Sequence, residues 1–141
     1  MKKAAVIYWS GTGNTEAMAN AVAEGMKGAG AEVSLLSADA VSAADLAGLD
    51  AVALGCPAMG SEVLEDMEFE PMFDGCKSSL KGKRVALFGS YGWGGGEWMQ
   101  NWERDCRSSG IQLACDSVIC NDAPDDAALA ACQALGKALV D

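Results

Sequence analysis

The stretch YWSGTGNTEAMANAV at 8–22 decides the fold, because it joins a β-type run to a helix-type run. The residues that lead into it, AAVIY at 4–8, form the continuous apolar run that a buried parallel strand needs. Beyond the glycines, apolar side chains recur every four positions: Met18, Val22 and Met26. We therefore predict a strand, a glycine-rich turn, and a helix that Thr15 caps and Gly30 ends.

Four further β-type runs alternate with helix-type patterns along the rest of the chain. The runs are EVSLLS at 32–37, AVALG at 51–55, VALFGS at 85–90 and IQLACDSVI at 111–119. The first helix pattern is short, at 43–46, and is opened by Ser42. The second covers 97–109 before Gly110 and has Trp98, Trp102 and Cys106 on one stripe. The third is capped by Asp125, and its inward-facing residues would be Ala128, Cys132, Leu135 and Leu139. The stretch 62–73 stays ambiguous, since Pro71 would interrupt a helix there. This alternation predicts one doubly wound, five-stranded parallel sheet with helices on both faces.

The composition indicates a single folded domain over residues 1–141. Half of the residues are hydrophobic and 21% are charged, which excludes intrinsic disorder. No apolar run approaches the ~18 residues of a membrane span, and the run after Lys2 and Lys3 is shorter than the ~7–15 residues of a signal peptide's apolar core. We therefore expect a cytoplasmic protein that does not associate with membranes.

The net charge is −10, from 20 acidic and 10 basic residues. This balance argues against nucleic acid and anionic membranes as partners and favours positively charged protein surfaces. Within thirteen residues the chain carries Glu62, Glu65, Asp66, Glu68, Glu70 and Asp74. A solvated helix face is the simpler interpretation of these acids, and a docking surface for basic partners is the other.

The six cysteines have no metal-type spacing. The chain contains no C-x-x-C motif, no ferredoxin-type spacing and no histidine. In a cytoplasmic protein, we expect these thiols to act mostly as small buried apolar side chains, and we predict no metal site.

The segment SGTGNT at 10–15 has the chemistry of an anion-binding loop. Gly11 and Gly13 let successive backbone N–H groups converge, while the hydroxyl groups and the start of the helix add further donors. The simpler alternative is an ordinary turn before a capped helix, but six consecutive small or donor residues favour the cradle. It is neither a Walker loop, since no lysine follows, nor a complete G-x-G-x-x-G loop, since Glu16 replaces the last glycine. A phosphate held by neutral donors alone keeps its charge, which would lower the potential of a redox cofactor bound there.

Ligands of such sheets bind at the carboxyl ends of the strands. The segments found there are WSGTGNT at 9–15, CPAMGSE at 56–62, YGWGGGE at 91–97 and CNDAP at 120–124. Three of them are rich in glycine, serine, threonine or asparagine, and one carries a tryptophan. A phosphoacceptor domain would need an aspartate after 51–55, where this chain has Cys56. The loops therefore predict a ligand site.

Three segments together resemble the flavodoxins, in particular the short-chain bacterial kind. They are VIYWSGTGNTE at 6–16, GCPAMGSEVLED at 55–66 and LFGSYGWGGGEWM at 87–99. The resemblance runs from the first strand to the last helix. It implies a flavodoxin-like sheet with strand order 2-1-3-4-5, one non-covalently bound FMN, and low-potential electron transfer to redox partner proteins.

The resemblance also implies a set of cofactor-binding residues. The FMN phosphate would be held by Ser10, Thr12, Asn14 and Thr15 with the amides of Gly11 and Gly13. One loop beside the flavin would be Pro57, Ala58, Met59, Gly60, Ser61 and Glu62, and the other Ser90, Tyr91, Gly92, Trp93 and Gly94, with Trp93 stacked on the ring and Asn121 near its edge. Trp9 stays open between a core position and a ribityl contact, whereas Trp98 and Trp102 are assigned to the core.

Gly60 suggests how this site would control the flavin. Because glycine accepts positive φ, the Met59–Gly60 peptide could turn its carbonyl toward the N5–H of a neutral semiquinone. A net hydrogen bond of ~0.5–1.5 kcal/mol would favour the one-electron state. Glu62 would accept from N3–H, and its charge would oppose the anionic hydroquinone. We therefore expect a second reduction at strongly negative potential.

These features predict a monomeric one-electron carrier that cycles between semiquinone and hydroquinone and has no substrate of its own. The first alternative is an NAD(P)H-dependent quinone or nitro reductase on the same fold, although no spare basic cluster is evident for a nicotinamide cofactor. The second is an interaction module that has lost its cofactor, although the intact loops argue against it.

Overall fold

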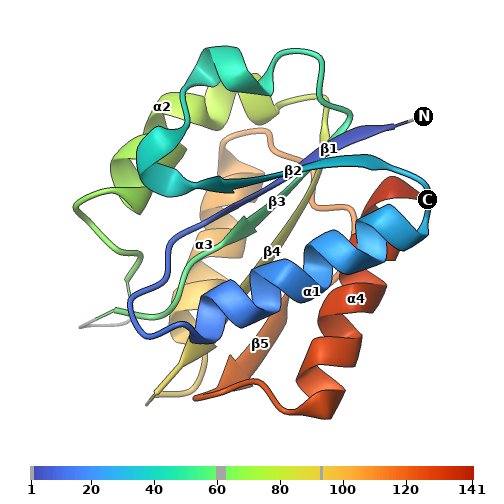
Figure 1. The fold of residues 1–141 in the computed structure, drawn as a ribbon. Coiled ribbons are helices and arrows are strands. Elements are labelled where there is room, and N and C mark those ends of the chain that lie inside the picture. The colour runs from blue at the N-terminus through green and yellow to red at the C-terminus, as the bar shows by residue number, and fades with distance from the viewer. Residues whose placement is uncertain (1, 60–62, 93) are drawn as a thin grey trace.

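The computed structural model describes residues 2–59, 63–92 and 94–141 and contains one parallel sheet of order β2-β1-β3-β4-β5 (Figure 1). The strands are β1 (Lys3–Tyr8), β2 (Glu32–Ser37), β3 (Ala51–Gly55), β4 (Arg84–Tyr91) and β5 (Val118–Asn121). The helices are α1 (Asn14–Gly28), α2 (Phe69–Leu80), α3 (Glu97–Ser108) and α4 (Asp126–Val140), with 3-10 turns η1 (Ala38–Ala40) and η2 (Ala43–Leu46). The predicted sheet and strand order are confirmed, and β2, β3 and η2 have the predicted bounds.

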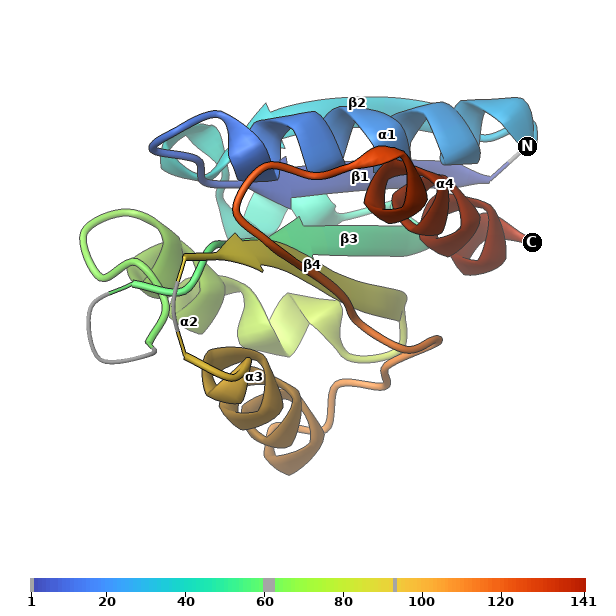
Figure 2. The ribbon, with the colours of Figure 1, turned by 90° about the horizontal axis from the view of Figure 1, so that it is seen from below.

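The sheet separates two apolar cores, with α1 and α4 on one face and α2 and α3 on the other (Figure 2). Successive strand residues point to opposite faces, so Ala5 and Ile7 of β1 join the core under α2 and α3, whereas Ala4 and Val6 join the other. Aromatic rings fill the α2–α3 core, where Phe69 lies edge-on to Trp102 with ring centroids 5.3 Å apart. Trp98 and Trp102 are buried, as predicted.

The fifth strand is shorter than the predicted run 111–119. Leu113 forms only an isolated parallel bridge to Val85, and continuous pairing with β4 begins at Val118. Residues 114–117 separate the two stretches and include the polar pair Asp116 and Ser117, of which the Ser117 hydroxyl donates to Glu103 Oε2 of α3 at 2.7 Å. The polar pair therefore breaks the apolar run, which periodicity alone had joined.

Helix α2 occupies part of the stretch that the sequence left ambiguous. Pro71 is the third residue of this helix. The first four N–H groups of a helix have no partner within it, so a proline in the first turn removes no helical hydrogen bond. Pro71 thus lies in the first turn of a helix. The sequence left the stretch 62–73 ambiguous because the proline was interpreted as an interruption.

The start of α1 also differs from the prediction. Its N-cap is Gly13, whose φ of 95° lies in the left-handed region that favours glycine. Thr15 is the second helical residue and does not cap. By contrast, Asp125 caps α4 as predicted, since its Oδ1 accepts the Ala128 N–H at 2.8 Å.

Four of the six cysteines are buried (Cys56, Cys76, Cys106 and Cys132), whereas Cys115 and Cys120 are partly exposed. The predicted role as apolar filler therefore holds for the four. In the described part of the chain, the longest α-helices have 15 residues, and none is long and apolar enough to cross a membrane.

Candidate functional site

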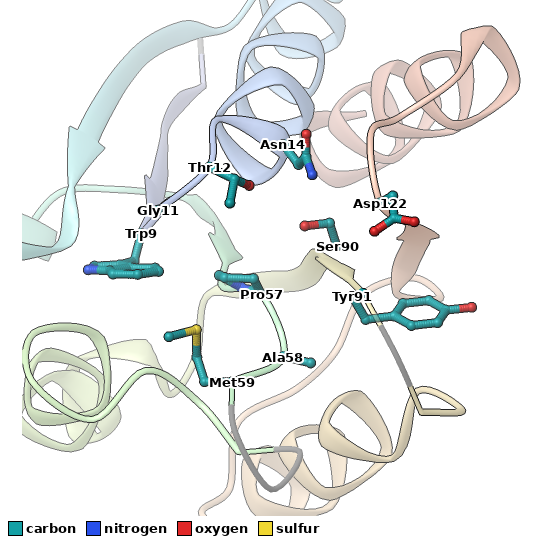
Figure 3. Close-up of a pocket in the computed structure, with 11 residues that line it drawn as sticks. Trp9, Gly11, Thr12, Asn14, Pro57, Ala58, Met59, Ser90, Tyr91 and Asp122 are labelled. Carbon is teal, nitrogen blue, oxygen red and sulfur yellow. The ribbon is translucent and has the colours of Figure 1, made fainter.

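A cavity of about 230 Å³ opens at the carboxyl ends of β1, β3 and β4 (Figure 3). It lies beside the pairing of β1 with β3, where the order of the strands reverses, which is the usual ligand position in such sheets. The lining residues come from the carboxyl ends of β1, β3, β4 and β5 and the segments that follow them: Trp9, Gly11, Thr12, Asn14, Pro57, Ala58, Met59, Ser90, Tyr91, Gly92 and Asp122. The described lining contains no lysine or arginine.

The loop between β1 and α1 forms one side of the cavity and is organised by a single hydroxyl group. Ser10 Oγ accepts the N–H of Gly13 at 3.1 Å and that of Glu16 at 3.2 Å. These bonds fold the loop back over the start of α1, while Thr12 and Asn14 line the cavity. Hydroxyl, amide and backbone donors thus surround the positive end of the helix dipole, which is suited to an anion.

Thr15 fastens this loop to the sheet. Its hydroxyl lies 3.2 Å from the hydroxyl of Ser90 at the end of β4, and both side chains are buried. Buried hydroxyls are costly unless they are paired, so this contact fixes the distance between the loop and β4. Of the two residues, only Ser90 lines the cavity.

The segment after β3 forms the opposite side. Ala58 N–H donates to the Ser90 carbonyl at 3.0 Å, which extends the contact of β3 with β4 beyond the strand. Further on, Met59 and Val63 exchange two backbone hydrogen bonds of 2.9 and 3.1 Å. The Met59 carbonyl is therefore already an acceptor, and turning it toward a ligand, as predicted for the Met59–Gly60 peptide, would break its bond to Val63.

Glu65 holds the next part of this segment. Its carboxylate is only 5% exposed and accepts the N–H groups of Met67, Glu68 and Phe69, each at 2.8 Å. Burial raises the pKa of this carboxyl group, but the three N–H donors outweigh burial and bring the pKa below its ordinary value. The prediction of a solvated acidic face is therefore wrong for Glu65, which is a buried acceptor at the start of α2.

Cys56 is buried and immediately precedes the lining residue Pro57. Its Sγ accepts the Glu65 N–H at 3.4 Å, and its carbonyl accepts the indole N–H of Trp98 at 3.1 Å. Burial raises the pKa of the thiol to about 12, so Cys56 stays neutral and is a poor nucleophile. Its role here is to connect β3 with the start of α2 and with α3.

Two lining residues were not among the predicted site residues. Trp9, which the sequence left undecided, lines the cavity and donates its indole N–H to Glu68 Oε1 at 3.0 Å. Asp122 follows β5 with a φ of 57° and lines the cavity next to Gly92. The sequence held a signal for Asp122, because aspartate tolerates the left-handed backbone region that often follows a strand. From the segment CNDAP, however, only Asn121 was predicted as a site residue.

The cavity brings together nine of the predicted residues: Gly11, Thr12, Asn14, Pro57, Ala58, Met59, Ser90, Tyr91 and Gly92. Ser10, Gly13 and Thr15 support the first loop, whereas Gly94 and Asn121 lie outside the lining. The predictions for Gly60, Ser61, Glu62 and Trp93 concern positions outside the described residues. Polar groups therefore lie at one end of the lining and apolar side chains at the other, an arrangement suited to a ligand that carries both an anionic group and an apolar ring.

Comparison with known proteins identifies the family. The flavodoxin family model matches residues 6–135. Flavodoxin of Megasphaera elsdenii is 47% identical over 133 residues, which cover 94% of this chain and 95% of the relative. Flavodoxin of Clostridium beijerinckii is 43% identical over 122 residues, which cover 86% and 88%.

Solved structures agree with the sequence comparison. The two-electron reduced M. elsdenii flavodoxin superimposes with a TM-score of 0.89 at 47% identity, covering 97% of this chain and 98% of that one. A flavodoxin from the domain Archaea gives a TM-score of 0.85 at 31% identity, covering 98% and 96%.

The chain belongs to the flavodoxin family. It is accordingly an electron carrier that uses FMN, and nothing in the comparisons supports the alternative of an NAD(P)H-dependent reductase.

Proposed function

We propose that residues 1–141 form one domain whose cavity at the ends of β1, β3 and β4 holds FMN non-covalently for low-potential electron transfer. The observation that carries this assignment is the polarity of the lining, with neutral donors at the loop before α1 and apolar side chains opposite. FMN has a matching distribution of polar and apolar groups, because its phosphate and its ring lie at opposite ends of the molecule.

The phosphate end of FMN fits the loop between β1 and α1. We assign the phosphate to the donors of Thr12 and Asn14 and to the backbone N–H groups of 10–15 other than that of Gly13, which donates to Ser10 Oγ, with Ser10 and Thr15 as supports of the loop. A Cβ on Gly11 would lie 3.0 Å from Trp9 Cη2, so a side chain at this position would press on the indole and require it to shift by a few tenths of an ångström. A loop of this shape accepts a single phosphate group without a metal ion or a cationic side chain.

The ring end fits the apolar walls. Pro57, Ala58 and Met59 come from one side of the cavity and Tyr91 from the other. The roles predicted for Gly60, Ser61, Glu62 and Trp93 beside the flavin remain part of the proposal.

When bound, FMN supplies one-electron redox chemistry, and the protein's part is to set its potential. Neutral donors leave the phosphate charge uncompensated, and Asp122 adds a carboxylate at the cavity. Negative charge close to a cofactor opposes the addition of further negative charge, more strongly where water is excluded. These residues therefore favour a low potential for the last electron.

The carrier has no substrate of its own in this proposal and passes electrons as a monomer to proteins with basic surfaces. The support is an exposed acidic cluster formed by Asp66, Glu68 and Glu70, in a segment that also carries the exposed side chains of Val63 and Met67; Glu68 contacts the cavity residue Trp9. Reversing these charges should slow electron transfer and weaken its salt dependence, and unchanged rates would contradict the docking assignment. The free thiols are compatible with work in the reducing cytoplasm.

An anaerobic reductive titration followed by visible absorbance tests the assignment. We expect the apoprotein to take up one FMN and the complex to accept two electrons in separate steps, the second only from a strong reductant. An apoprotein that ignores FMN would point to the cofactor-free module, and rapid reduction by NAD(P)H in stopped flow would restore the reductase. Both electrons entering together at an ordinary potential would refute the low-potential assignment.

A further inference from the structure

The indole of Trp9 is fixed at both ends of its side chain. Trp9 follows β1, and its backbone N–H donates to the carbonyl of Gly55 at the end of β3, at 3.0 Å. Its Nε1–H donates to Glu68 Oε1 at 3.0 Å. In Figure 3 the ring lies along the wall of the cavity with its nitrogen pointing away from the cavity centre. The contact with Glu68 therefore sets the ring's orientation without occupying ligand space.

The acceptor is itself held in place. Glu68 is the N-cap residue of α2, and its backbone N–H donates to the buried carboxylate of Glu65 at 2.8 Å. The Glu68 side chain makes no capping hydrogen bond to the helix, so its carboxylate is available to the indole. A hydrogen bond to an ionised acceptor on a fixed backbone is stronger and better directed than a neutral one.

The opposite edge of the indole meets the phosphate loop. A Cβ on Gly11 would lie 3.0 Å from Cη2 and 3.3 Å from Cζ3 of Trp9, so the ring already packs against this glycine. The indole is thus confined between Gly11 and Glu68. A ring that moved toward Gly11 would displace the loop, and one that moved away would open the cavity wall.

We propose that Glu68 is a positioning residue for FMN, which acts by holding Trp9 in the cavity wall and does not touch the cofactor. The inference rests on the proposed FMN cavity. It assigns a specific task to one member of the acidic cluster, whose other members serve as surface charges. Asp66 is the matched member, because among the described residues its side chain makes no hydrogen bond or ion pair.

The test measures FMN dissociation constants by titrating each apoprotein into FMN and following flavin fluorescence. Glu68→Ala should weaken binding about three- to tenfold, the range expected for one lost hydrogen bond. Glu68→Gln keeps an acceptor without the charge and should weaken binding less than Glu68→Ala does. Asp66→Ala removes an exposed charge from the same segment and should also stay within about twofold.

A second background separates positioning from stability or charge. In Trp9→Phe, which has no indole N–H, Glu68→Ala should have no further effect on FMN affinity, because the bond is already absent. In ¹⁵N-correlated NMR spectra of the apoprotein, the Trp9 Nε1–H signal should shift in Glu68→Ala and not in Asp66→Ala. Urea unfolding of each apoprotein identifies any variant whose fold has weakened.

Three outcomes would overturn the inference: equal affinities for Glu68→Ala and the original protein, equal losses in Glu68→Gln and Glu68→Ala, or an undiminished Glu68→Ala effect in the Trp9→Phe background. Each presupposes that the original protein binds FMN. Failure of the unaltered apoprotein to bind FMN would instead refute the proposed function.

Discussion

Two loops border the cavity, and in each of them one side chain gathers backbone N–H groups. In the loop before α1, the hydroxyl of the half-buried residue Ser10 accepts two of them, at 3.1 and 3.2 Å. Before α2, the buried carboxylate of Glu65 accepts three, each at 2.8 Å. The neutral acceptor leaves the phosphate side free of added charge, while the charged one holds its loop more tightly but depends on staying ionised.

The largest effect should follow from removing the charged acceptor. Glu65→Ala leaves three N–H groups without their partner, at least one of them at the buried residue Phe69. We expect the free energy of unfolding to fall by about 2–4 kcal/mol, measured by urea denaturation of the apoprotein. Asp66→Ala, one residue further on, should change it by less than about 0.5 kcal/mol. Equal losses in the two variants would show that Glu65 does not organise this loop.

Acid should distinguish the two loops next. Because the pKa of Glu65 is lowered in the folded protein, the unfolded chain takes up its proton first. The stabilisation by this carboxylate is therefore complete above the ordinary glutamate pKa and is lost as the pH falls through the lowered, folded-state value. Between neutral pH and this acid range, urea midpoints should fall less in Glu65→Gln than in the original protein. Parallel pH profiles would contradict the role of the charge.

These loops also show how far the sequence could lead. Hydrophobic periodicity and glycine-rich turns were sufficient for a five-stranded parallel sheet and for the loop at 10–15, since both follow from local patterns, whereas the strand order came from the resemblance to the flavodoxins and the bounds of β5 were missed. The role of Glu65 could not be read, because an acid within an acidic cluster looks solvated until the fold buries it. The Trp9–Glu68 bond joins positions far apart in the chain, and Asp122 enters the cavity through one residue's left-handed backbone. Such long-range contacts have no periodic signature.

Removing the neutral acceptor should have a smaller effect than removing Glu65. Ser10→Ala abolishes the two hydrogen bonds to Gly13 and Glu16 in an exposed loop, which should weaken FMN binding about five- to tenfold, or roughly 1 kcal/mol. Flavin fluorescence titration measures the loss, which should be the same at pH 6 and pH 8 because no ionisable group is removed. Ser37→Ala, which loses a hydroxyl at the end of β2, is the control. A loss of FMN affinity that varies with pH in Ser10→Ala, but not in Ser37→Ala, would contradict the role of Ser10 as an uncharged acceptor.

The smallest effect concerns charge at the cavity itself. Asp122→Asn removes one negative charge from the lining, and asparagine tolerates the left-handed φ of 57°. The reduction potential for the second electron should rise by roughly 10–40 mV. This is less than the ~59 mV that a tenfold change in a one-electron equilibrium constant represents, because water partly screens the exposed carboxylate. Equilibration with a reference dye measures this potential, and the shift should shrink as salt is added. Ser10→Ala changes no charge and should leave this potential nearly unchanged. Equal shifts in the two variants would mean that an altered position of FMN, and not the charge of Asp122, controls the second reduction.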